Sequence, residues 1–288
     1  MLFRVGIYLY FLIGVIGYSA QQVSTPTILY SKQSPFGLIE VVATEEPGVL
    51  KICENKIYDV IHSTFMQGDP TYLGLLYVPL STISFCYAKN LKKVLLLGLG
   101  AGDFLSYMMK YFPNTEVDAV EINPVMIDIV KKFREQDMQK APRYFCEDGF
   151  KYIDKLKRKY DLIFCDMYFG KPAISKNYQD LFEKLRNCLE AGGAFIFNAY
   201  IPFMPRAVIG DMLKCFDNTV AIIAKDGANI VFICYQGPAK SKEDMEAIAK
   251  NMQSKYKFRY PLDEQAKQLK LISTADHETW VTKFPVLE

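Results

Sequence analysis

The chain has 288 residues, of which half are hydrophobic and 23% are charged. Its formal net charge at pH 7 is only +2 and no long basic run occurs, so nucleic acid is not favoured as a partner. The length suits one large domain, or one large domain with one small domain.

An apolar run, VGIYLYFLIGVIG at 5–17, follows Arg4 near the N-terminus. It ends in small residues before a polar stretch, which is the layout of a secretory signal peptide. A membrane span needs about 20 apolar residues, more than this run offers. We therefore expect residues 1–20 to be a signal peptide, cleaved near Ser19 or Ala20, and the protein to be secreted or lumenal. The alternative is an uncleaved segment that anchors the chain in a membrane.

The seven cysteines do not show the pattern of a disulfide framework, although secretion would permit one. Their number is odd, their spacing is wide, and several fall in apolar runs, so most are expected to be small buried hydrophobes. No cysteine or histidine pair has the spacing of zinc ligands, and neither His62 nor His277 belongs to a recognisable triad or metal motif. No metal is expected.

Residues 27–66 are expected to form a small N-terminal β-domain. Runs rich in β-branched and aromatic residues alternate there with turns that contain proline or glycine, which predicts an antiparallel sheet. The next segment, 69–88, is expected to be a helix, with Asp69 as its cap and Pro70 in its first turn.

From Lys92 onward, apolar runs typical of strands alternate with helical segments of about 10–13 residues. This alternation predicts βαβ units and a mainly parallel sheet, and the continuous apolar central runs indicate that both sheet faces are covered. Two later runs, 218–225 and 229–236, are expected to form a hairpin that adds an antiparallel strand. Its turn is expected at Asp226-Gly227.

These patterns divide the chain after the signal peptide into three parts. Residues 67–240 are assigned to a Rossmann-like, nucleoside-binding transferase domain that follows the small β-domain. Residues 241–288 are assigned to a C-terminal helical tail, with one helix expected at 241–256.

Glycines and acids follow four successive strands, at the edge where such sheets bind ligands. The first strand leads into GLGAGD at 98–103, a loop that lets the backbone approach a ligand and that opens a helix with free N–H groups. Glu121 ends the second strand, where an acid can accept from ribose hydroxyls. Asp148 and Gly149 follow the third strand, where the acid can accept from an adenine amino group or simply cap a helix. Asp166 ends the fourth strand and points to the middle of the cleft.

The four positions together match a site for an S-adenosylmethionine-type ligand. A dinucleotide enzyme would share the glycine loop and the ribose acid, but it would not predict the Asp148-Gly149 pair and Asp166 in addition. The predicted fold class is therefore α/β, a class I S-adenosylmethionine-dependent methyltransferase-like (Rossmann-like) sheet with a small N-terminal antiparallel β-domain.

Over residues 28–236 the chain resembles the spermidine synthase family, in particular its spermidine-synthase-like, methyltransferase-like branch. The resemblance rests on the small β-domain, on GLGAG, VEINP, EDGFKYI and YDLIFCDMY, and on the Gly-Gly pair before the fifth strand. It implies S-adenosylmethionine or its decarboxylated form as cosubstrate, S-adenosylhomocysteine or methylthioadenosine as product, no metal, and a homodimer. The residues implied for nucleoside binding are Gly98, Gly100, Gly102, Asp103, Glu121, Asp148 and Gly149, and the catalytic residue implied is Asp166.

The chain departs from the family pattern on the acceptor side. Ala101 stands where an acid of the glycine loop is expected, although Asp103 follows two residues later. Phe169 takes the place of the second acid of a D-x-x-D arrangement, and Tyr-Leu-Gly at 72–74 replaces a Tyr-His-Glu stretch. The residues expected on the acceptor side are Tyr72, Tyr168 and Phe169.

The residues expected to bind the nucleoside keep the family pattern, whereas those on the acceptor side depart from it. This combination favours a methyltransferase-like enzyme with an unidentified small-molecule acceptor. The alternative is an aminopropyltransferase that makes spermidine or spermine, which needs another acid, such as Asp103, for the one missing at Phe169. A third possibility is a secreted binding protein that has kept the fold without catalysis.

Overall fold

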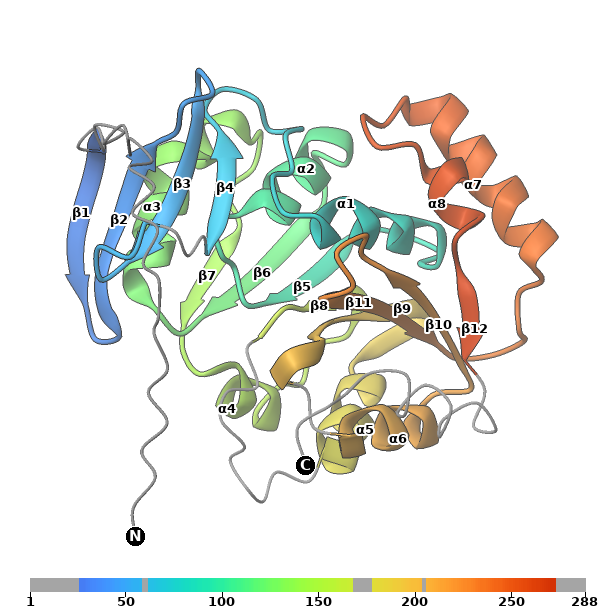
Figure 1. Cartoon of the computed structure of the whole chain (residues 1–288). Coiled ribbons are helices and arrows are strands. Elements are labelled where there is room, and N and C mark those ends of the chain that lie inside the picture. Colours follow the sequence, from blue (N-terminus) through green and yellow to red (C-terminus); the bar gives the residue numbers. More distant parts are fainter. Residues whose placement is uncertain (1–25, 59–61, 168–177, 204–205, 273–288) are drawn as a thin grey trace, which may run out of the picture.

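The computed structural model describes residues 26–58, 62–167, 178–203 and 206–272. They form a mixed α/β fold with a small four-stranded sheet and a larger eight-stranded sheet (Figure 1). The expected signal peptide at 1–20 lies outside the described residues. Within the described part of the chain, no helix has both the length and the apolar character needed to cross a bilayer.

The small sheet is antiparallel throughout, as the sequence predicted. Its apolar side chains, among them Val41, Ile52 and Phe65, pack on Ile129 and Phe133 of helix α3 (Pro124–Phe133). This packing attaches the small sheet to the larger one. The strands follow one another in space as in the chain: β1 (Ile28–Ser34), β2 (Gly37–Ala43), β3 (Val49–Glu54) and β4 (Ser63–Met66).

The larger sheet has the strand order β12-β10-β11-β9-β8-β5-β6-β7. Strands β5 to β9 run parallel, whereas β10, β11 and β12 join antiparallel. The chain leaves β5 first toward β6 and β7 and then returns to β8 on the other side, so the topological switch point lies between β5 and β8. The strands are β5 (Lys93–Leu97), β6 (Glu116–Glu121), β7 (Arg143–Cys146), β8 (Tyr160–Cys165), β9 (Leu189–Tyr200), β10 (Asn218–Ile223), β11 (Asn229–Tyr235) and β12 (Lys270–Ile272).

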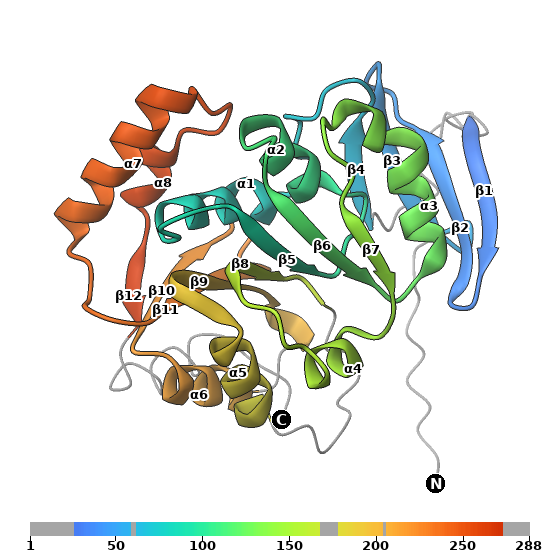
Figure 2. The same cartoon turned by 180° about the vertical axis from the view of Figure 1, so that it is seen from behind.

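Helices cover both faces of the larger sheet (Figures 1 and 2). Because side chains alternate along a strand, Leu96 of β5 joins the core beneath α1, α2 and α7, whereas Leu95 and Leu97 join the core against α4, α5 and α6. The helices are α1 (Tyr77–Ser81), α2 (Asp103–Tyr111), α3 (Pro124–Phe133), α4 (Gly149–Asp154), α5 (Tyr178–Asn187), α6 (Arg206–Cys215), α7 (Lys242–Tyr256) and α8 (Leu262–Ala266).

The helix predicted at 69–88 is wrong in its first part, because α1 begins only at Tyr77 and passes into a 3₁₀ helix at 82–86. Asp69 caps a turn instead, since its Oδ1 accepts hydrogen bonds from the backbone N and Oγ1 of Thr71. Gly74 lies so close to the small sheet that a Cβ there would be 1.7 Å from Oγ1 of Thr64. The segment before α1 is therefore shaped by contact with β4.

The C-terminal part contains the expected helix and an unexpected strand. Helix α7 begins at a capping box, in which Ser241 and Asp244 satisfy each other's backbone N–H groups, and it spans the predicted segment. Strands β10 and β11 form the predicted hairpin. Strand β12 was not predicted, and it extends the sheet by pairing antiparallel with β10.

All seven cysteines lie in the described part of the chain, and all are free thiols. Six are buried and only Cys146 is exposed, which agrees with the prediction that most serve as small hydrophobes.

Candidate functional site

A cavity of about 250 Å³ lies at the carboxyl ends of β5, β6 and β8, beside the switch point. Three carboxyl groups line it: Asp103 at the start of α2, Glu121 at the end of β6, and Asp166 directly after β8. Among the described residues that line it there is no lysine or arginine. His62 also borders the cavity, and its Nε2 lies 3.3 Å from Oε2 of Glu54. The cavity thus suits a cationic ligand.

The glycine loop brings β5 and β8 together at this cavity. Gly98, Gly100 and Gly102 all have positive φ angles, of 88°, 55° and 74°. A Cβ at Gly98 would lie 2.6 Å from the backbone oxygen of Asp166, so only glycine lets the end of β8 come this close. Gly98 and Gly100 line the cavity, whereas Gly102 is the N-cap of α2 and packs against Val130.

Glu121 is held against the glycine loop by two backbone N–H groups. Its Oε2 accepts from Leu99 and its Oε1 accepts from Asn123, each at 2.9 Å. Burial raises the pKa of Glu121, and the backbone donors offset part of this effect. The backbone N–H groups of Gly100 and Ile122 also lower the pKa of this carboxyl group, so it is held in place at the glycine loop.

Asp166 sits between two side-chain donors. The hydroxyl of Tyr77 donates to Oδ2 and Nδ2 of Asn198 donates to Oδ1, both at 2.7 Å. Asn198 is oriented in turn by Asn229, whose Nδ2 donates to Oδ1 of Asn198 at 3.1 Å. Burial raises the pKa of Asp166, while the two donors act in the opposite direction. The carboxyl group is therefore fixed in position.

Asp103 links the cavity to the small sheet. The hydroxyl of Ser63, the first residue of β4, donates to Oδ2 of Asp103 at 2.9 Å. Burial raises the pKa of Asp103 to about 6, although Arg134 and the Ser63 hydroxyl lower it. Its Oδ1 has no hydrogen-bond partner among the described residues, and the same holds for Nη2 of the buried Arg134. One oxygen of this carboxyl group is thus buried without a hydrogen bond, which costs free energy.

Other predicted site residues are not among those that line this cavity, although a Cβ at Gly149 would lie 2.1 Å from Sδ of Met167, the residue after Asp166. Asp148 caps α4, since its Oδ1 accepts from the backbone N of Phe150, and neither Asp148 nor Gly149 lines the cavity. Tyr72 also lies outside the lining, beneath the guanidinium group of Arg259. Tyr168 and Phe169 lie outside the described residues.

Several residues of the site were missed by the sequence analysis. Tyr77 fell inside the predicted helix at 69–88, and Ser63 fell at the end of the small β-domain. Asn198 was detectable, because it is a lone amide within the apolar run FIFNAY. Ile122, next to Glu121, is a large apolar side chain that is 47% exposed at the end of this strand.

No group of three or more histidine, cysteine, aspartate or glutamate side chains in the described ranges is arranged to hold a metal ion.

Comparison with known families gives one match, to the spermine/spermidine synthase domain over residues 78–234. Among curated proteins, the polyamine aminopropyltransferase of Clostridium perfringens is 30% identical over 142 residues, which cover 48% of this chain and 47% of that protein. The polyamine aminopropyltransferase of Neisseria meningitidis is 26% identical over 216 residues, which cover 72% of this chain and 80% of that protein. The chain spans about half the length of the first of these curated relatives.

The fold is similar to that of a probable spermidine synthase from Corynebacterium glutamicum. The TM-score is 0.67 with 17% sequence identity, and the match covers 90% of this chain and 95% of the other. Both the small antiparallel sheet and the parallel-rich sheet thus belong to a known architecture.

Proposed function

Because the chain belongs to the spermine/spermidine synthase family, we propose that it transfers the aminopropyl group of decarboxylated S-adenosylmethionine to an amine. The similarity to polyamine aminopropyltransferases supports this reaction over the methyl transfer that the sequence analysis favoured. The acceptor is an amine that carries positive charge in water, such as a diamine.

One observation carries the choice of cosubstrate: carboxyl groups line the cavity, and no lysine or arginine does so among the described residues. S-adenosylmethionine carries a carboxylate next to its ammonium group, and this carboxylate would face Asp103 and Asp166 without a counter-ion. Two like charges 4 Å apart repel by about 4 kcal/mol at an effective dielectric constant of 20. The decarboxylated nucleoside offers only a sulfonium and an ammonium group, which these acids favour.

On this proposal the nucleoside lies along the glycine loop. Glu121 accepts hydrogen bonds from the ribose hydroxyls, and the exposed side chain of Ile122 packs against the base. Backbone N–H groups at the start of α2, and Gly98 and Gly100, which line the cavity without side chains, let the ligand approach the chain.

The reaction is a displacement at the carbon attached to the sulfonium sulfur. A neutral amine nitrogen forms the new C–N bond, the C–S bond breaks, and its electron pair passes to sulfur, which leaves as neutral methylthioadenosine. The amine loses one proton. Asp166, held by Tyr77 and Asn198, orients the acceptor amine and accepts this proton on its way to water.

Asp103 supplies a second negative charge for a cationic chain. It lies in the cavity together with Asp166, and its Oδ1 makes no hydrogen bond to a described residue. It therefore partly replaces the acid that is missing where Phe169 stands in the sequence.

Methyl transfer from S-adenosylmethionine is the second candidate. Phe169 favours it, because an aromatic residue in place of the second acid weakens recognition of a polyamine.

The test is to incubate the protein with putrescine and either cosubstrate and to measure both products by mass spectrometry. Formation of methylthioadenosine and spermidine from the decarboxylated cosubstrate, and its loss in Asp166→Asn, supports the proposal. Formation of S-adenosylhomocysteine supports methyl transfer. If folded protein binds neither cosubstrate nor methylthioadenosine in calorimetry, the enzyme proposal is rejected in favour of a binding protein.

We also propose that residues 1–20 direct the chain into the secretory pathway and that the protein is a homodimer. Sequencing the N-terminus of protein secreted from cells tests the first proposal. Light scattering on the purified protein tests the second.

A further inference from the structure

The C-terminal helices α7 and α8 lie beside α1, the helix that begins with Tyr77 (Figures 1 and 2). Together with the turn between them they form a unit, residues 242–266, that we call the C-terminal unit. Its side chains Phe258 and Leu262 are buried in the same core as Leu73, which precedes α1. The C-terminal unit therefore packs on the segment that carries Tyr77.

Two polar contacts join the C-terminal unit to this segment. The hydroxyl of Tyr260, in the turn between α7 and α8, accepts from the backbone N of Leu73 at 3.0 Å and donates to the backbone oxygen of the same residue at 3.3 Å. On α8, Nε2 of Gln265 donates to Oγ1 of Thr82 at 3.2 Å. Leu73 lies before Tyr77 in the chain and Thr82 lies after it, so the unit holds the segment at both ends.

Both contacts are made by buried groups. Leu73 is 5% exposed, and Thr82 and Gln265 are also buried. Without the hydroxyl of Tyr260, the backbone N–H and C=O groups of Leu73 would lose this partner in a place that water reaches poorly, which costs free energy. The segment would shift to reduce this cost.

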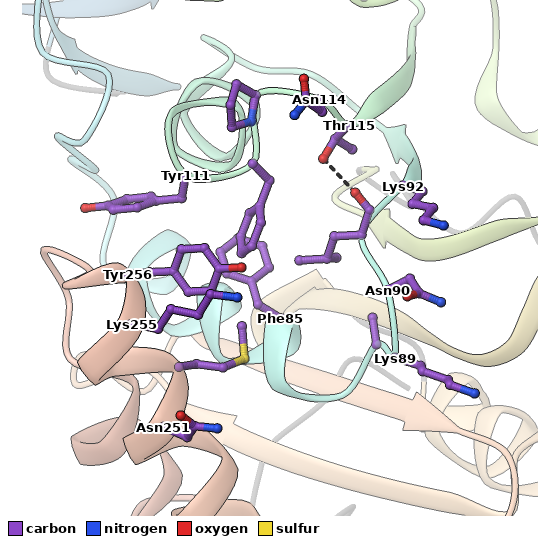
Figure 3. A pocket seen from close by; sticks show the side chains of 15 residues that line it. Phe85, Lys89, Asn90, Lys92, Tyr111, Asn114, Thr115, Asn251, Lys255 and Tyr256 are labelled. Atoms are coloured by element: carbon purple, nitrogen blue, oxygen red, sulfur yellow. Dashed lines mark hydrogen bonds between the residues drawn. The ribbon is translucent and has the colours of Figure 1, made fainter.

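The remaining docking contacts of the unit are aromatic and leave a gap. Phe85 of the 3₁₀ helix and Tyr111 of α2 contact Phe258, with ring centroids 5.9 and 4.6 Å away. Beside these contacts, Phe85, Tyr111 and Tyr256 line a cavity of about 560 Å³ (Figure 3). Apolar contacts are not directional, so the two hydrogen-bonded contacts described above are what sets the position of the segment.

We propose that the C-terminal unit positions Tyr77 for the carboxylate-lined cavity, with Tyr260 and Gln265 as the positioning residues. The hydroxyl of Tyr77 donates to Oδ2 of Asp166 at 2.7 Å, and a hydrogen bond weakens steeply when its donor is displaced or turned. A shift of the segment therefore weakens this bond although every residue that lines the cavity is kept. Only the expected effect on the reaction rate rests on the proposed function.

The titration of Asp166 reports on this bond. Burial raises the pKa of Asp166, and the hydrogen bonds from Asn198 and Tyr77 lower it, so weaker donation from Tyr77 should raise it. The other titratable groups among the described residues that line the cavity are His62, Asp103 and Glu121. All of them, and Asn198, are retained when Tyr260 is changed.

The experiment follows the ¹³C resonance of the Asp166 carboxyl group by NMR as the pH is varied, with Asp166→Asn to assign it. Tyr260→Phe keeps the ring and removes only the hydroxyl, and it should move the titration to higher pH by about half a pH unit. Tyr77→Phe should move it further. The double variant should titrate like Tyr77→Phe alone, because Tyr260 acts through Tyr77.

Tyr111→Phe is the matched control. The hydroxyl of Tyr111 accepts from the backbone N of Arg259 at 3.0 Å, so the variant removes a hydrogen bond to the same C-terminal unit without touching Leu73. It should leave the titration of Asp166 unchanged. The proposal is overturned if Tyr260→Phe titrates as wild type, if Tyr111→Phe shifts the titration equally, or if the shifts of the two single variants add in the double variant.

Gln265→Met provides a second test at the other end of the segment, should Tyr260→Phe fail to fold. It removes the donor to Thr82, and it should also move the titration of Asp166 to higher pH; an unchanged titration would count against the proposal. With putrescine and the decarboxylated cosubstrate, the acid limb of the rate profile should move in the same direction. Folded protein that turns over neither cosubstrate rejects the proposed function, whereas the NMR titration needs no turnover and still decides whether the C-terminal unit positions Tyr77.

Discussion

The hydroxyl of Tyr77 donates a hydrogen bond of 2.7 Å to Oδ2 of Asp166, although 89 positions separate the two residues in the chain. The bond joins the start of α1 to the carboxyl group at the switch point. Burial, and then the nearby carboxylate of Asp166, raise the pKa of Tyr77 well above its usual value. Tyr77 therefore remains a hydrogen-bond donor across the working pH range.

Replacing Tyr77 by phenylalanine should slow the reaction and shift its pH dependence. The variant removes one of the two donors that lower the pKa of Asp166, so the acid limb of the rate profile should move to higher pH. We expect kcat to fall about tenfold, as for the loss of a hydrogen bond to a charged group. The matched control is Tyr72→Phe, from the same segment but outside the cavity lining. Identical profiles for both variants would argue against a role for Tyr77.

Replacing Glu121 by glutamine should weaken nucleoside binding. The change removes the negative charge and one acceptor beside the glycine loop, so the affinity for methylthioadenosine in calorimetry should fall about 10- to 100-fold. Glu147→Gln is the control, because Glu147 also follows a strand but pairs with Lys155 outside the cavity lining. Unchanged affinity in Glu121→Gln would show that the nucleoside binds elsewhere.

Asp103 should make the stability of the protein depend on pH. Its pKa rises from 3.8 to about 6 on folding, so between these values the folded state holds a proton that the unfolded chain has released. Wild-type stability should therefore decrease, through this group, as the pH rises from about 4 to 6. Relative to wild type, Asp103→Asn should gain about 2 to 3 kcal/mol in free energy of unfolding between pH 4 and pH 7. Urea denaturation at both pH values measures this, and a constant difference would contradict it.

Replacing Gly98 by alanine should destabilise the fold more than the same change at Gly227. Both glycines have positive φ, which costs alanine about 1 to 2 kcal/mol. Only at Gly98 would the new Cβ also meet a backbone atom, the oxygen of Asp166 at 2.6 Å, whereas at Gly227 nothing lies within 4 Å. We expect a total loss of about 3 kcal/mol or more for Gly98→Ala, measured by denaturant unfolding. Equal losses would show that the loop relaxes away from β8.

The strands β5 to β9, their mainly parallel arrangement and the β10–β11 hairpin were predictable because their signals are local. Apolar runs, helix lengths and the Asp226-Gly227 turn all lie within short windows of sequence. Strand β12 was missed because its three residues pair only with β10, far earlier in the chain. The first part of the predicted helix at 69–88 failed for a similar reason, since contact with Thr64 overrides the cap signal at Asp69.

Prediction of the candidate site from the sequence was limited in the same way, because local signals do not show how separate elements pack together. Glu121 and Asp166 were predictable, because parallel strands place their carboxyl ends at one edge of the sheet. Ser63 and Tyr77 were not, because their positions depend on how the small sheet and α1 pack against the glycine loop. The Asp148-Gly149 pair left two interpretations open in the sequence. Oδ1 of Asp148 caps α4, and the adenine contact stays a prediction because the cap leaves the second carboxyl oxygen available.

The pairing of β12 with β10 has a consequence for synthesis of the protein. A nascent chain emerges from the ribosome with its N-terminal part first, so the outer edge of β10 stays uncovered until residues 270–272 have been made. An uncovered edge can recruit strands of other chains, and ribosomes that stall or terminate before these residues would release an aggregation-prone product.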